Sequence, residues 1–131
     1  MKKNKINYIT YQAFPSKKAN TIQTMDNIKY FEKNGYDVEL TFPLREKIST
    51  SDKKILKDYY PISDNLIING EEHKLPFGKI FILEKFLFLI SHFLWSWKIS
   101  KTFKSEDSVN FTRSDWIFYF LSKKNLHVIF E

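Results

Sequence analysis

The 131 residues of this chain suit one domain and leave little room for a second. Hydrophobic residues make up 43% of the chain and aromatic residues 18%, so a core can form and disorder is not expected. The formal charge is +6, but Arg45 and Arg113 are the only arginines and the lysines are scattered, which argues against nucleic-acid binding. The absence of cysteine excludes disulfides and thiolate metal sites, and it fits a reducing cytoplasm.

The first third of the chain predicts a strand, a loop, a helix and a second strand. Residues 5–12 alternate in polarity and are rich in strand formers, and Pro15 marks the loop that follows. Asn20 is the expected helix N-cap, with Gln23 at the capping-box position, and Gly35 ends the helix. The second strand is expected at 36–42. Only the turn at Gly35-Tyr36 joins the helix to this strand, and such a compact strand–helix–strand unit predicts a right-handed crossover and a parallel sheet.

The same alternation continues to the end of the chain. The expected elements are a loop at 43–50, a short helix from a Ser51 cap over 51–60, a short strand or hairpin arm near 65–69 before Asn69-Gly70, a long helix at 79–103, a strand at 108–112, a helix at 114–124 and a strand at 127–130. We therefore predict an α/β, Rossmann-like three-layer domain with a mainly parallel sheet. The chain ends directly after the last strand, so we expect a fold truncated at its carboxyl end.

Residues 79–103 form the most apolar segment. Glu84-Lys85, Ser91-His92 and Lys98 recur every seven residues and predict a polar stripe. The wide remaining face carries Phe81, Phe86, Phe88, Phe93, Leu94, Trp95 and Trp97. We favour burial of this helix against the sheet. The alternative is a peripheral membrane contact through 79–103, with nearby lysines at the lipid headgroups; a membrane-spanning helix is the least favoured interpretation.

Several familiar catalytic motifs are absent. The three glycines, at 35, 70 and 78, exclude both the dinucleotide-binding fingerprint and the P-loop. His73, His92 and His127 are far apart in sequence, so no metal site and no cofactor are predicted. There is no Gly-x-Ser-x-Gly motif to anchor a hydrolase triad.

The remaining signal is one of position. The loop 13–19, the turn 112–114 and Glu131 each follow a predicted strand, and the carboxyl ends of parallel strands share one edge of the sheet. Helix N-termini favour anions at that edge. Lys17 and Lys18 are interpreted as a solvated loop. Arg113 would repel the N-terminus of the helix that follows it, so a binding role, or pairing with Glu131, is the better explanation for it.

Two segments carry a family resemblance. "ANTIQTMDNIKYFEKNGYDVELTFP" resembles the first helix and second strand of the amino-terminal domain of glycosyltransferase family 4, and "NFTRSDWIFYFLSKKNLHVIFE" resembles a later segment of that domain. Together they cover well under half of the chain, and 43–107 gives no family signal. The resemblance implies that residues 1–131 are the acceptor-side Rossmann-like domain of a GT-B enzyme that retains anomeric configuration without an essential metal. The donor-binding domain is absent, so this chain alone is expected to be inactive.

The resemblance also implies a site and partners. Substrate-binding residues would be Phe14, Asn20, Thr21, Gln23, Thr112, Arg113 and Glu131, while catalytic residues stay unassigned. In the complete enzyme the partners would be a nucleotide-sugar donor and a sugar or lipid-linked acceptor, in surface glycan or glycolipid synthesis. The expected location is the cytoplasm, at the inner face of the membrane. The alternatives are a free-standing, non-catalytic Rossmann-like binding module that docks on a partner and, less favoured, a basic nucleic-acid binder.

Overall fold

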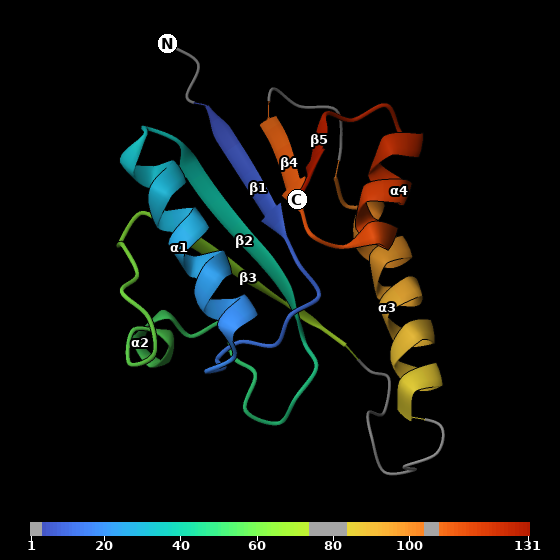
Figure 1. Cartoon of the computed structure of the whole chain (residues 1–131), viewed down its shortest axis with the longest axis horizontal. Coiled ribbons are helices and arrows are strands. Elements are labelled where there is room, and N and C mark those ends of the chain that lie inside the picture. The colour runs from blue at the N-terminus through green and yellow to red at the C-terminus, as the bar shows by residue number, and fades with distance from the viewer. Residues whose placement is uncertain (1–3, 74–83, 104–107) are drawn as a thin grey trace.

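The computed structural model describes residues 4–73, 84–103 and 108–131 and confirms the α/β prediction. All described strands are parallel, in the order β3-β2-β1-β4-β5, and the domain has a Rossmann-like three-layer arrangement (Figure 1). The elements are β1 (Lys5–Ile9), α1 (Ala19–Lys33), β2 (Asp37–Leu44), α2 (Lys53–Leu56), β3 (Ile67–Glu72), α3 (Glu84–Ser100), β4 (Ser108–Thr112), α4 (Asp115–Lys123) and β5 (Val128–Phe130).

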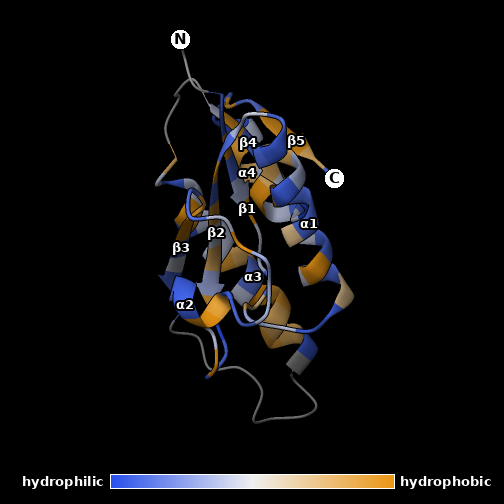
Figure 2. Cartoon of the chain, turned by 90° about the vertical axis from the view of Figure 1, so that its left-hand side faces the viewer, coloured by the Kyte–Doolittle hydropathy of each residue, from blue (hydrophilic) through white to orange (hydrophobic). Residues whose placement is uncertain are grey.

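Two hydrophobic cores lie on opposite faces of the sheet. On one face, α1 and α2 cover Ile6, Tyr8 and the alternate residues of β2. On the other face, Ile9 packs with side chains of α3 and α4. Figure 2 shows hydrophilic and hydrophobic residues mixed along α1, as expected for a helix that buries one side. Strand β1 is thus buried on both faces, as central strands of parallel sheets usually are.

A polar contact lies within the second of these faces. Asn7 and Asn110 are register partners on β1 and β4, and both are buried. The Asn7 Nδ2 group donates to Asn110 Oδ1 at 3.1 Å and to Ser108 Oγ at 3.2 Å. Asn110 Nδ2 in turn donates to the carbonyl oxygen of His127 at 3.1 Å. The amides therefore link β1, β4 and the start of β5.

Two predicted helix caps are wrong. Helix α1 begins at Ala19, its N-cap is Lys18, and Asn20 lies inside its first turn without capping it. Ser16 causes the earlier start, because its Oγ accepts from the Lys18 N–H and its carbonyl accepts from the Thr21 hydroxyl. Helix α2 is one turn long and is capped by Asp52 rather than Ser51; the Asp52 carboxylate accepts from Lys54 N at 2.9 Å.

The alternative of a hairpin arm before Asn69-Gly70 is also wrong. Both residues lie inside β3, which pairs parallel to β2. Gly70 is needed for close packing, because a Cβ atom there would lie 2.8 Å from Leu44 Cδ2 and 2.9 Å from Ser51 Cβ. A glycine in a strand can mark such an approach as well as a turn.

Helix α3 faces the sheet differently from the prediction. Its buried face carries Ser91, Ser96 and Ser100 beside Trp95 and Ile99, so part of the expected polar stripe points inward. Of the expected aromatic face only Trp95 is buried; Phe86, Phe88, Phe93, Leu94 and Trp97 are exposed, and Phe81 lies outside the described residues. Among the described residues, no helix has the length and apolar character needed to cross a bilayer.

We expect Gly70→Ala to destabilise the protein by about 1–3 kcal/mol, because the added methyl group must displace Ser51 and the Leu44 side chain. Urea unfolding followed by circular dichroism measures the change. Ser51→Gly removes one of the two contacts, so the double variant should recover part of the loss. A Gly70→Ala variant as stable as the parent would show that this approach is not tight.

Candidate functional site

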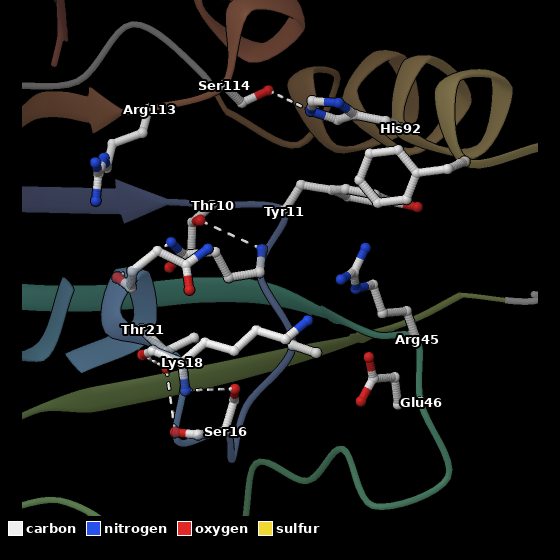
Figure 3. A pocket seen from close by; sticks show the side chains of 14 residues that line it. Thr10, Tyr11, Ser16, Lys18, Thr21, Arg45, Glu46, His92, Arg113 and Ser114 are labelled. Carbon is white, nitrogen blue, oxygen red and sulfur yellow. Dashed lines mark hydrogen bonds between the residues drawn. The ribbon is translucent and has the colours of Figure 1, made fainter. Parts of the chain in front are cut away.

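A cavity of about 370 Å³ opens at the carboxyl edge of the sheet (Figure 3). It lies where the segment after β1, the start of α1, the loop after β2, helix α3 and the turn after β4 converge. The residues that line it are Thr10, Tyr11, Gln12, Ala13, Ser16, Lys18, Asn20, Thr21, Arg45, Glu46, Phe88, His92, Arg113 and Ser114. Four separate parts of the sequence, 10–21, 45–46, 88–92 and 113–114, therefore form one cavity.

Side chains of the loop after β1 hold its backbone in place. The Gln12 amide accepts from the Thr24 hydroxyl at 2.7 Å and donates to the Asn20 carbonyl at 3.2 Å, which ties the loop to α1. The Tyr60 hydroxyl donates to the Ser16 carbonyl at 2.5 Å from the far side. These bonds order the loop without the glycines of a phosphate-binding loop.

The cavity is electropositive. Lys18, Arg45 and Arg113 line it from three segments, against the single carboxylate of Glu46 among its lining residues. Lys18 and Arg45 extend into it from opposite sides in Figure 3. The Arg45 guanidinium also lies 5.1 Å from the ring centroid of Tyr11 and 5.2 Å from that of Phe88, in cation–π geometry. Such a cavity favours an anionic ligand.

An aromatic wall closes one side of the cavity. The rings of Tyr11 and His92 stack with centroids 4.4 Å apart, and His92 Nε2 lies 2.5 Å from Ser114 Oγ. Burial, helped by Arg45, lowers the pKa of His92 to about 4; burial also raises the pKa of Tyr11 to about 12, although Arg45 opposes that shift. Both rings are therefore neutral at neutral pH. His92 is a weak base there and serves as a packing surface.

The predicted site residues separate into three groups. Asn20, Thr21 and Arg113 line the cavity. Gln23 and Glu131 lie beside it, in contact with Arg113. Phe14 and Thr112 are buried and are not among the residues that line the cavity: Phe14 packs on Phe42 and Tyr60 in the core, and the Thr112 hydroxyl accepts from the Ser114 N–H.

Arg113, at the N-terminus of α4, is paired with the carboxylate of Glu131. Its Nε lies 3.5 Å from Glu131 Oε2, and its Nη1 donates to Gln23 Oε1 at 3.1 Å. Asn27 Nδ2 donates to the same Glu131 carboxylate at 3.1 Å. The predicted pairing of Arg113 with Glu131 is confirmed. The pairing offsets the repulsion between the guanidinium and the N-terminus of α4, and the Asn27–Glu131 hydrogen bond ties the end of β5 to α1.

Of the charged and aromatic residues that line the cavity, sequence reasoning assigned only Arg113 to the site. Lys18 was assigned to a solvated loop, whereas it lines the cavity. Arg45 directly follows β2, the same signal of position that singled out Arg113, and so could have been found. Phe88 and His92 come from α3, and no local pattern indicates that this part of the helix reaches the carboxyl edge.

Within the described residues, no group of three or more His, Cys, Asp or Glu side chains could hold a metal ion. Comparison of the chain with protein-family models, with curated proteins and with solved structures found no match. The chemistry of the cavity is therefore the observation from which function is argued.

The neutral state of His92 predicts a loss of stability in acid. In the unfolded chain His92 becomes protonated as the pH falls below the ordinary histidine pKa of 6.5. In the folded chain it becomes protonated only near pH 4. Stability should therefore fall between pH 6.5 and 4, by roughly 2 kcal/mol after allowing for partial exposure of the ring. Urea unfolding at several pH values measures this contribution as the difference between the parent chain and His92→Gln.

The control for this experiment is His127→Gln, because the His127 side chain is exposed. That variant should keep the acid sensitivity of the parent chain, whereas His92→Gln should lose about 2 kcal/mol of it. Equal losses of stability in the parent and in His92→Gln would contradict the assignment of a neutral, buried ring.

Proposed function

We propose that this chain is the acceptor-side domain of a retaining, GT-B glycosyltransferase, as the resemblance to family 4 implies. The observation that carries the proposal is the cavity at the carboxyl edge, into which Lys18, Arg45 and Arg113 bring positive charge from three segments. Ligands of open parallel α/β sheets bind at this edge. The nucleotide would be held mainly by a second domain, which explains a first loop that is ordered without glycines.

The charge of the cavity indicates what kind of acceptor it takes. Lys18 and Arg45, together with Arg113, whose charge Glu131 partly balances, suit an acceptor with a phosphate or diphosphate group. The partly exposed ring of Phe88 offers an apolar surface for a sugar. A lipid-linked acceptor has both parts. We therefore place the activity in the cytoplasm, at the inner face of a membrane, in surface glycan or glycolipid synthesis. In this role the cavity orients the acceptor and the donor domain supplies the activated sugar.

The alternative, a non-catalytic binding module, shares the fold and the anionic ligand. The two differ in one measurable property, because the module would never transfer a sugar. On its own the chain should transfer no sugar under either hypothesis. A donor-side domain supplied in the same polypeptide or in solution distinguishes them: transfer supports the enzyme, and binding without transfer supports the module.

We expect the chain to bind inorganic pyrophosphate, used as a probe for the acceptor's anionic group, and Lys18→Ala to weaken that binding about tenfold, the effect of one lost contact to a charged group. Lys17→Ala is the matched control, because Lys17 lies in the same loop but lines a different cavity. Isothermal calorimetry at low salt measures both. Equal weakening by the two substitutions would show a diffuse charge effect in place of a site.

In an enzyme that joins this domain to a donor-binding domain, Arg113→Ala should lower the rate of sugar transfer by about a hundredfold, the scale of one lost charged contact in the transition state. Thermal stability should change little, because the Arg113–Glu131 pair is partly exposed. Near-normal turnover, or failure of the variant to fold, would remove Arg113 from the site. The test concerns the reaction itself and is independent of pyrophosphate binding.

A further inference from the structure

Helix α3 turns its more apolar face away from the sheet. Serines supply much of its buried side, whereas Phe86, Ile90, Phe93, Leu94 and Trp97 point outward and are 38–60% exposed. Side chains of this size usually fill the core face of an amphipathic helix. An exposed face this apolar is typical of a surface that binds a membrane or another protein.

Helix α4 continues the same surface. It lies beside α3 (Figure 1), and the ring of Phe93 packs on Trp116 at 4.8 Å and on Phe120 at 5.4 Å between centroids. Trp116 and Tyr119 are 37% and 44% exposed. We call the outward residues of the two helices the α3/α4 face: Phe86, Ile90, Phe93, Leu94, Trp97, Trp116, Tyr119 and Phe120.

Lys98, Lys101 and Lys123 gather at one end of the α3/α4 face, whereas Lys85 lies at the other end, on the first turn of α3. The Lys101 ammonium lies 3.6 Å from the ring centroid of Trp97, and the Lys123 ammonium lies 4.8 Å from that of Tyr119. Lys98 is exposed on the last turn of α3. The exposed carboxylate of Asp115 is on the first turn of α4, eight residues from Lys123 and thus at the opposite end of that helix.

The two helices run in the same direction, which brings their lysine-bearing ends together. His92 of α3 contacts Ser114, the cap of α4, and eight residues further along α3 the carbonyl of Ser100 accepts from Lys124 Nζ at 2.7 Å. Between these contacts the chain advances in the same direction along both helices, by eight residues on α3 and ten on α4, so Lys98, Lys101 and Lys123 form one cationic border beside the aromatic side chains.

This arrangement matches the chemistry of a membrane interface. Trp and Tyr side chains favour the boundary between headgroups and acyl chains, and a lysine can lay its aliphatic stem on apolar surface while its ammonium group reaches the headgroups. An anionic headgroup layer complements the lysine border. A protein partner could cover the aromatic residues, but the clustering of the cations at one border favours an anionic surface.

We propose that the α3/α4 face binds an anionic lipid bilayer, with Phe93, Trp97 and Trp116 inserted at the interface and Lys101 and Lys123 at the phosphates. The chain would lie on the membrane without crossing it. This inference stands on the exposed face alone and does not rest on the proposed function: a binding module with the same face would attach in the same way.

Flotation of the full chain with lipid vesicles tests the proposal. We expect recovery with vesicles of phosphatidylcholine mixed with phosphatidylglycerol, and little with phosphatidylcholine alone. Lys101→Glu combined with Lys123→Glu should lower the partition coefficient by at least about tenfold, because each lysine near an anionic surface contributes measurably. Trp97→Gln should lower it about tenfold through lost apolar contact.

Two matched controls lie away from this face. Lys29→Glu reverses an exposed charge on α1, and Tyr59→Gln removes an exposed aromatic ring just after α2. Neither residue belongs to the α3/α4 face, so neither substitution should change the partition coefficient by more than about twofold. Circular-dichroism melts of every variant confirm that each is folded. All the substituted side chains are at the surface.

Three outcomes would overturn the proposal. The first is equal recovery with neutral and anionic vesicles, or no recovery with either. The second is a Trp97→Gln variant that floats like the parent chain, which would assign the effect to dispersed lysines. The third is a concentration-dependent dimer in sedimentation velocity that Trp97→Gln abolishes while vesicle binding is absent, which would assign the face to a second copy of the chain.

Discussion

Parallel pairing on both sides of β1 is the constraint on which the rest of this domain depends. Because β2 and β4 both run parallel to β1, residues 10–13, 45–46 and 113–114 emerge at the same edge of the sheet. Crossovers must then pass over the faces, which covers β1 on both sides and sets the N-termini of α1 and α4 at that edge. The cationic cavity follows from this topology, since its three cations are far apart in sequence.

Much of the fold could be predicted because local pattern and topology agree. Alternating strands, short connections and Gly35 at the end of α1, where φ is +88°, indicate the parallel α/β order without long-range information. The errors arose where one residue type serves two purposes. Asn20 has a capping side chain, but the contacts of Ser16 start the helix two residues earlier. Gly70 suggests a turn, but packing against Leu44 and Ser51 requires it.

The site was less predictable than the fold, for a physical reason. Residues that follow strands, such as Arg113, can be placed by topology alone, and Arg45 belongs to the same class. Phe88 and His92 cannot, because the polar residues of α3 suggest a solvent-facing side, whereas the serines among them in fact face the sheet. Their contribution depends on how α3 docks, and that is decided by the shape of its serine-rich face beside Ile9 and Trp95.

The paired amides of Asn7 and Asn110 have a consequence for how the chain selects its alignment. They join segments 103 positions apart, and they meet only when β1 and β4 are in their native stagger. A shift of either strand by one residue would separate the two amides and leave each without this hydrogen bond, which destabilises the fold by about 1–3 kcal/mol for each buried amide. Aliphatic side chains would accept several staggers almost equally. This amide contact therefore discriminates against compact but misaligned forms of the domain.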